Sequence, residues 1–133
     1  MNGILFVDLL YSFYMKALSA TPVVHVSDFN RALDYYINVL GFSEDFKLEA
    51  YAGLLLDDVL IYICGPANQG IQKAPGQTLF CIHCDEVDTY FVTISKKGAL
   101  ILGPPTDRYY GIRDFAVNDP DGNTLVFGAD LQG

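Results

Sequence analysis

Two histidines, His25 and His83, are the residues of this chain best suited to proton transfer near neutral pH. They are the only histidines in the sequence and stand 58 positions apart, each at the end of a run that is typical of a β-strand. An imidazole in such a place could bind a ligand or act as a general acid or base. It could equally be held by backbone hydrogen bonds at the strand end, and the sequence leaves both interpretations open.

A carboxylate, Asp114, is the third candidate for acid–base chemistry. It could polarise a nearby histidine or pair with a cationic ligand, or it could form an ion pair with Arg113 or Arg108. Tyr109 and Tyr110 precede it in a loop, where their rings could stack on a flat or cationic ligand. They could instead fill a seam between two copies of the chain.

Cys81 and Cys84 enclose His83 in a Cys-x-x-Cys pattern. A redox pair needs two thiols close together, whereas positions 81 and 84 of a strand point to opposite faces. We therefore expect two buried, unbridged cysteines, and a redox or zinc site stays open only because Cys84 lies at a strand–helix junction. Together with Cys64 there are three cysteines, which is not a disulfide framework, so we expect a reduced, cytoplasmic protein.

The elements that position these residues follow from hydrophobic spacing. In the first half, a strand over residues 21–26 leads into a helix over 29–40, which Ser27 and Asp28 can cap and Gly41 can end. Three strand-like runs follow, over residues 42–49, 51–56 and 59–64.

The second half repeats this order: a strand over 78–83, a helix from Asp85 or Glu86 to about Lys97, and further strands. These strands cover residues 99–102, 112–117 and 124–127, with a hairpin turn over 119–123. The offset of 58 aligns four pairs of positions: His25 with His83, Phe29 with Val87, Leu33 with Phe91, and Tyr36 with Ile94. The repeat predicts an α+β fold of two tandem βαβββ modules.

We expect one domain over 1–133, made of an N-terminal extension (1–18), module 1 (19–66), a linker (67–76) and module 2 (77–131). Residues 4–14 are apolar, but Asp8 interrupts them and a bilayer span needs roughly 20 residues. We therefore expect neither a signal peptide nor a membrane span. Met15 is a better natural start than Met1, and the residues before it could be an upstream extension or an arm that packs in a dimer.

The bulk composition favours a globular protein that binds no nucleic acid. The 133 residues are 51% hydrophobic and carry a formal net charge of −8. Nucleic acid would repel such a surface, because its recognition needs clusters of Lys and Arg. The acidic balance is compatible with a cationic ligand, and it could equally serve only solubility.

Each module offers one helix to cover one face of its strands, so the other faces are left to form a cup. Strand alternation turns Ile61, Ile63, Leu125 and Phe127 toward the helices. The residues expected to line the cup or its mouth and to bind a ligand are Thr21, His25, Tyr62, Cys81, His83, Tyr109, Tyr110, Asp114, Thr124 and Val126.

Three stretches, in this order and spacing, resemble the vicinal oxygen chelate superfamily of glyoxalase I, bleomycin-resistance proteins, fosfomycin-resistance enzymes and extradiol dioxygenases. They are His25–Asp28 running into Ala32–Tyr36 and Leu40–Phe42, then Tyr110–Phe115, and finally Asp119–Asn123 followed by a strand. The resemblance spans about residues 21 to 130. It implies the cupped mixed sheet of that fold, a small-molecule ligand and a homodimer.

Metal-dependent members of this superfamily place His, Gln or Glu on four strands of the cup. The positions that match here hold Thr21, Tyr62, Leu79 and Val126. Leu and Val cannot donate to a metal, and Thr and neutral Tyr are poor ligands for a divalent ion. We therefore expect no metal and no other cofactor.

The resemblance implies two classes of function. The first is a protein that binds a small organic ligand, such as an antibiotic or a toxic metabolite, in a metal-free cup, as bleomycin-resistance proteins do. The alternative is a lyase, isomerase or dioxygenase-type enzyme that uses shifted metal ligands or acid–base catalysis by His25, His83 or Asp114. A regulatory module that senses a metabolite is a third option, which the lack of a DNA-binding segment disfavours.

Overall fold

Two sheets with matching connectivity make up the computed structural model, which describes residues 14–131. The first half contains β1 (Val23–His25), α2 (Phe29–Asp34), η1 (Tyr35–Val39), β2 (Ser43–Lys47), β3 (Tyr51–Leu56) and β4 (Val59–Cys64). The second half contains β5 (Leu79–His83), α3 (Asp88–Lys96), β6 (Leu100–Ile101), β7 (Thr106–Asp107), β8 (Ile112–Asn118) and β9 (Thr124–Asp130). The predicted α+β order of two tandem βαβββ modules is confirmed, with β7 as an additional short strand that the sequence did not predict.

The strand order shows the repeat most clearly. The first sheet runs β1-β4-β3-β2 and the second runs β5-β9-β8-β6, with β7 also pairing with β8. In each sheet the first strand lies parallel to the last, and its terminal histidine is paired in register: His25 with Cys64, and His83 with Gly128. The two histidines therefore occupy equivalent positions, one beside a thiol and the other beside a residue without a side chain.

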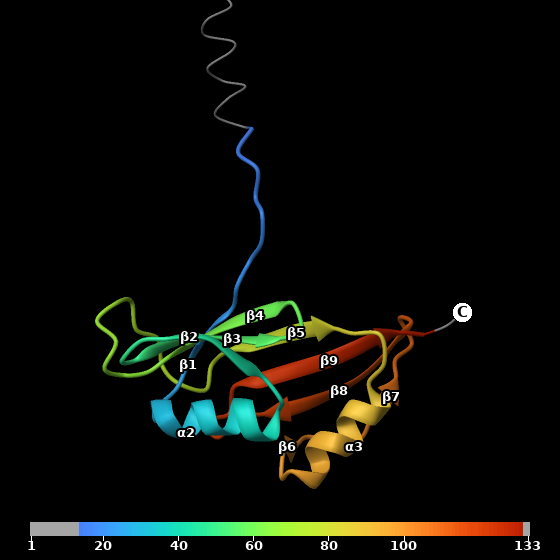
Figure 1. Ribbon diagram of the computed structural model, residues 1–133. Coiled ribbons are helices and arrows are strands. Elements are labelled where there is room, and N and C mark those ends of the chain that lie inside the picture. Colours follow the sequence, from blue (N-terminus) through green and yellow to red (C-terminus); the bar gives the residue numbers. More distant parts are fainter. Residues whose placement is uncertain (1–13, 132–133) are drawn as a thin grey trace, which may run out of the picture.

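Both helices cover the same side of the strands, and the opposite side is left open (Figure 1). The alternating residues of the strands that face the helices form one continuous core across both modules. Its largest fully buried members are Tyr36, Phe115, Phe127, Leu40, Leu54, Ile61, Ile63, Ile94 and Leu125. We call the uncovered side of the strands the open face.

The first helix begins as predicted but widens halfway. Asp28 caps it, because its carboxylate accepts a hydrogen bond from the backbone N–H of Arg31 at 3.1 Å. Residues 35–39 then form a π-helix, in which the backbone N–H of Leu40 donates to the carbonyl of Tyr35 at 3.1 Å. The prediction of one regular helix over 29–40 was therefore wrong for residues 35–39. Such π-helical turns occur often at functional positions.

The turn over residues 119–123 fastens the two modules together. The hydroxyl of Tyr35 donates to the carbonyl of Asn118 at 2.6 Å, and that of Tyr36 donates to the Asp119 carboxylate at 3.0 Å. The side-chain amide of Asn123 donates to the carbonyl of His25 at 3.0 Å. Asp119 and Asn123 are buried. The turn and the two tyrosines therefore join the second module to the first through buried hydrogen bonds.

The second helix begins later than predicted. It runs from Asp88, not from Asp85 or Glu86, because Glu86 stays outside the helix and its carboxylate accepts a hydrogen bond from the backbone N–H of Thr89 at 2.9 Å. That bond lowers the pKa of Glu86. Gly98 ends the helix with a φ of 89°, which side chains disfavour.

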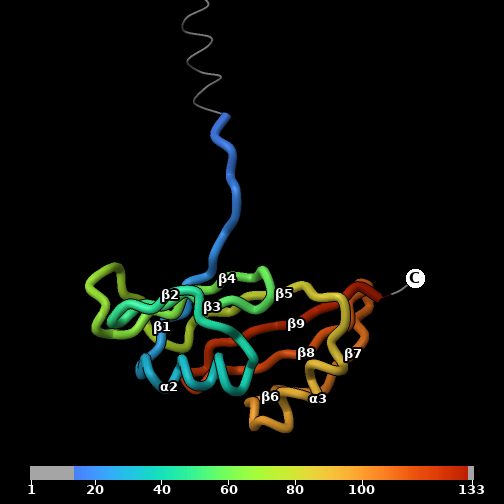
Figure 2. The backbone as a smooth tube through the Cα atoms, in the orientation of Figure 1, coloured from blue at the N-terminus to red at the C-terminus, as the bar shows by residue number. Residues whose placement is uncertain are grey.

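An extended segment precedes the first strand. Residues 14–20 run away from the strands on the side opposite the helices (Figures 1 and 2). Tyr14, Met15 and Leu18 are exposed there. Most of the predicted N-terminal extension, including Met1 and Asp8, lies outside the described residues. Within the described part, no helix has the length and apolar character that a membrane crossing requires.

Candidate functional site

A small hollow on the open face of the second sheet brings together five of the residues expected to line the cup. It has a volume of about 140 Å³. The five are Cys81, His83, Tyr110, Asp114 and Val126, and Ile82, Ile112 and Gly128 complete the lining. We call it the C-terminal hollow.

Gly128 forms the floor of the C-terminal hollow. It is paired in register with His83 on one side and with Asp114 on the other. A Cβ at this position would meet a methyl group of Ile112 at 3.1 Å and the Cβ of Asp114 at 3.6 Å. The missing side chain therefore keeps the space between the imidazole and the carboxylate clear.

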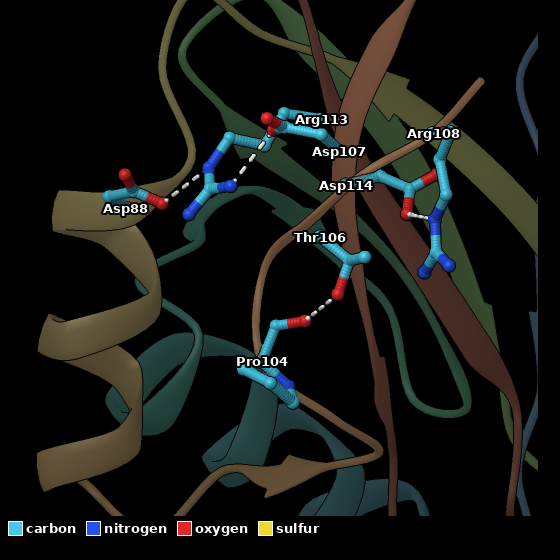
Figure 3. A network of polar contacts seen from close by, with 7 residues as sticks. All are labelled: Asp88, Pro104, Thr106, Asp107, Arg108, Arg113 and Asp114. Carbon is cyan, nitrogen blue, oxygen red and sulfur yellow. Dashed lines mark hydrogen bonds and ion pairs between the residues drawn. The ribbon is translucent and has the colours of Figure 1, made fainter. Parts of the chain in front are cut away.

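Asp114 is engaged by an arginine at the rim of this hollow (Figure 3). The guanidinium of Arg108 donates to its carboxylate at 2.8 Å, and the carboxylate and its hydrogen bond raise the pKa of Arg108. Arg113 turns away to Asp88 and Asp107, at 3.0 and 2.9 Å. Of the alternatives open for Asp114, the pairing with Arg108 is therefore the one formed, and no hydrogen bond in the described part joins it to a histidine.

His25 lies in a different pocket. It is only 7% exposed and faces a space of about 630 Å³ between the strands and the segment from Asn68 to Thr78. Its Nδ1 accepts a long hydrogen bond, 3.4 Å, from the backbone N–H of Lys73. His83 is exposed at the C-terminal hollow. The structure thus gives the two histidines equivalent strand positions without bringing them into one site.

Three aromatic rings form a shelf on the open face of the first sheet. Phe46, Tyr51 and Tyr62 are half-buried, with ring centroids 5.5 to 6.5 Å apart. Gly53 is paired with both Phe46 and Tyr62, and a Cβ there would lie within 2.8 Å of the Phe46 ring. Because Gly53 has no side chain, the ring of Phe46 can pack directly against the backbone of the sheet. We call these three residues the aromatic shelf.

Sequence reasoning found one of the three shelf residues and missed the other two. Tyr62 was expected in the cup because Ile61 and Ile63 turn inward, and both isoleucines are fully buried. The same alternation, with Ala52 and Leu54 buried, was available for Tyr51. Phe46 carried no such signal, because the register between β2 and β3 shifts between Glu44 and Phe46.

The remaining predicted residues are dispersed. Thr21 lines a groove of about 800 Å³ that runs past Cys81 at the seam between the two sheets. The hydroxyl of Thr124 donates to the side-chain oxygen of Asn118 at 2.7 Å. Tyr109 is fully exposed, with its ring edge-to-face against Tyr110 at 5.1 Å between centroids.

The three thiols have different surroundings. All are free, and Cys64 is buried, Cys84 half-buried and Cys81 exposed. The expectation that Cys81 is buried was wrong, because the open face of β5 has no covering layer in the monomer. The thiol of Cys84 donates to the carbonyl of Gly128 at 3.5 Å, and burial raises its pKa.

The four positions that hold metal ligands in related enzymes offer few donor atoms. Thr21, Tyr62, Leu79 and Val126 supply two hydroxyls between them, and Leu79 is 67% exposed. In the range 14–131, no group of three or more His, Cys, Asp or Glu side chains is placed to hold a metal ion. The residues present therefore do not fit the divalent-metal site of the superfamily.

Comparison with known proteins identifies a family and several relatives that this chain resembles. The model of the family described as "Glyoxalase/Bleomycin resistance protein/Dioxygenase superfamily" matches residues 18–127. A bleomycin resistance protein of Geobacillus stearothermophilus is 26% identical over 127 residues, which covers 83% of this chain and 95% of the relative.

Two solved structures show the same fold. A glyoxalase/bleomycin resistance protein/dioxygenase from Nocardioides has a TM-score of 0.75 at 14% identity, covering 98% of this chain and 95% of its own. A bleomycin-binding protein from Streptomyces verticillus, solved with copper(II)-bleomycin, has a TM-score of 0.70 at 24% identity, with 90% and 98% covered. Because the family model spans most of its length, this chain belongs to the glyoxalase/bleomycin resistance protein/dioxygenase superfamily.

Proposed function

We propose that the open face binds a small, flat organic molecule by stacking and a few hydrogen bonds. The observation that carries this proposal is the aromatic shelf, which presents three half-buried rings on the uncovered side of the first sheet. Aromatic rings supply large contact areas at low entropic cost, so they favour flat ligands. Because two of the relatives are a bleomycin resistance protein and a bleomycin-binding protein, bleomycin is the first compound to test.

The charge of the protein favours a cationic ligand. The chain carries a formal net charge of −8. Next to the C-terminal hollow, His83 also lines a pocket of about 440 Å³ whose rim carries four carboxylates, Asp57, Asp58, Asp85 and Glu86. The acidic surface would attract a cation, and the ring faces of the shelf would hold it.

A second copy of the chain is the proposed cover for the open face. The exposed apolar side chains on this side include Val23 (37%), Leu79 (67%), Leu100 (48%) and Leu102 (59%). Contact with a second copy would remove these side chains from water, which is favourable. A homodimer built over this face would enclose the ligand between two chains, and sedimentation of the wild type against Leu79→Lys tests it. A wild type that sediments as a monomer at micromolar concentration would contradict the dimer.

Three free thiols also favour a reducing compartment, and we propose that the protein works in the cytoplasm. Fractionation of the producing cells, followed by detection of the untagged protein, tests this assignment.

Calorimetric titration with bleomycin and with a panel of planar aromatic cations tests the binding proposal. We expect binding that weakens about twofold to twelvefold in Tyr62→Leu, because loss of one stacking ring removes about 0.5–1.5 kcal/mol. Val92→Ala, on the exposed side of α3, is the matched control and should bind like the wild type. Equal affinity of the wild type and Tyr62→Leu for every ligand that binds would reject the shelf as the binding surface.

A further inference from the structure

The C-terminal hollow combines a nucleophile with a base. Cys81 carries the only exposed thiol among the three cysteines of the chain. Accessibility is the first requirement for a reactive cysteine, and in the proposed homodimer Cys81 would be reached from the ligand space between the two chains. Cys64 fails it by burial, and Cys84 has both a raised pKa and a hydrogen bond to a carbonyl.

His83 lies two residues along the same strand, so its side chain points to the same face as that of Cys81. At the rise of a β-strand, the two α-carbons are about 6.6 Å apart. Both side chains line the C-terminal hollow and both are exposed, and a change of side-chain rotamer would bring the thiol to the imidazole. A thiol with an imidazole in reach is the usual arrangement for thiolate formation.

The hollow itself selects the kind of molecule that could meet this pair. Its volume of about 140 Å³ holds roughly four or five groups the size of a water molecule. Ile112 and Val126 make part of its wall apolar, Tyr110 adds a polar side chain, and the charge of Asp114 is already paired with Arg108. Such a space fits a short, uncharged molecule with one hydrogen-bond acceptor.

We propose that Cys81 captures small α,β-unsaturated carbonyl compounds covalently, with His83 as the proton acceptor. The thiol proton passes to the imidazole while sulfur forms a bond to the β-carbon of the compound. The electrons of the C=C bond move to the carbonyl oxygen, and the resulting enolate takes its proton back from the imidazolium at the α-carbon. The sum is addition of S–H across one C=C bond, with no other reactant.

This activity stands apart from the proposed stacking function, because it depends on the second sheet and not on the aromatic shelf. Tyr62→Leu should weaken the binding of flat ligands and leave the capture rate unchanged. If one of the two proposals fails, the other can therefore still be tested.

Acrylamide is a suitable probe, since it is short, uncharged and selective for thiols. The full-length protein is incubated with excess acrylamide, and the rate of adduct formation is followed by intact mass spectrometry with peptide mapping. We expect one adduct, on Cys81, and none in Cys81→Ser over the same period. Cys84→Ser is the matched control and should react at the wild-type rate.

The role of His83 is tested by His83→Gln, and by His83→Asn if the first variant folds poorly. At pH 6.5 we expect the rate to fall by about tenfold or more, because general base catalysis contributes at least this much. The difference between the wild type and the variant should be smaller at pH 8 than at pH 6.5, because the thiolate and not the thiol is the nucleophile. Equal rates and equal pH profiles in the wild type and both variants, or adducts spread over all three cysteines, would overturn the proposal.

Discussion

Removal of one hydroxyl, in Tyr36→Phe, should destabilise the protein measurably through the joint between the modules. The Tyr36 side chain is fully buried, and its hydroxyl donates to Asp119, which is 1% exposed. Three donors would remain on that carboxylate: the side-chain amide of Asn123 at 2.8 Å, and the backbone N–H groups of Asp121 and Asn123, each at 2.9 Å. The variant leaves the carboxylate buried with one hydrogen bond fewer.

The expected loss is about 1.5–3 kcal/mol, the usual contribution of a hydrogen bond to a charged group. It should lie in the lower half of that range, because the three remaining donors still compensate the charge. Tyr90→Phe is the matched control: its hydroxyl donates to the neutral carbonyl of Leu40 at 2.6 Å, and its loss should cost about 0.5–1.5 kcal/mol.

Urea unfolding, followed by circular dichroism, measures both losses. With a slope of about 1–3 kcal/mol per molar urea, Tyr36→Phe should lower the midpoint by roughly 0.5–2.2 M. A double-mutant cycle with Asp119→Asn should give a coupling above the roughly 0.5 kcal/mol found for independent sites. A coupling within that limit, or a loss no larger than that of Tyr90→Phe, would refute the assignment of this pair as a joint.

Three further predictions concern the same elements. Burial raises the pKa of Tyr36 and Tyr90, so as the pH rises the unfolded chain loses these protons before the folded chain does. The contribution of both groups to stability should therefore be complete below pH 10 and should fall above it. Unfolding at pH 9 and at pH 11 tests this, and an unchanged midpoint would contradict the burial. Gly53→Ala should displace the ring of Phe46, cost about 1–3 kcal/mol and weaken ligand binding, and a stable variant with full affinity would show that the ring does not rest there. Asn123→Ala should cost at least about 2 kcal/mol in thermal unfolding, because its amide serves both modules, and a loss below about 0.5 kcal/mol would disprove that role.

The fold was predictable because hydrophobic spacing and local signals agree along most of the chain. Asp28 and Gly41 frame the first helix as their residue types suggest, and the alternation around Ile61 and Ile63 assigns the faces of β4 correctly. The two-residue strand β7 escaped prediction because Thr106 and Asp107 carry no hydrophobic pattern and pair only through β8.

The site was only partly predictable, because it depends on contacts between segments far apart in the sequence. Strand alternation placed Cys81, His83 and Asp114 on one face, and they line one hollow. The partner of Asp114, Arg108, was one of two equally good options until the path of the loop was known. The separation of the two histidines was hidden as well, because the segment that covers His25 has no periodic pattern.

The buried joint also bears on the order in which the molecule can form during synthesis. The first module leaves the ribosome with two tyrosine hydroxyls and the carbonyl of His25 still lacking the partners that residues 118–123 provide. Those partners come 83 to 98 residues later in the chain, so the N-terminal half cannot complete these hydrogen bonds until the second module has been made. The hairpin of β8 and β9 therefore completes the hydrogen bonding of the first half.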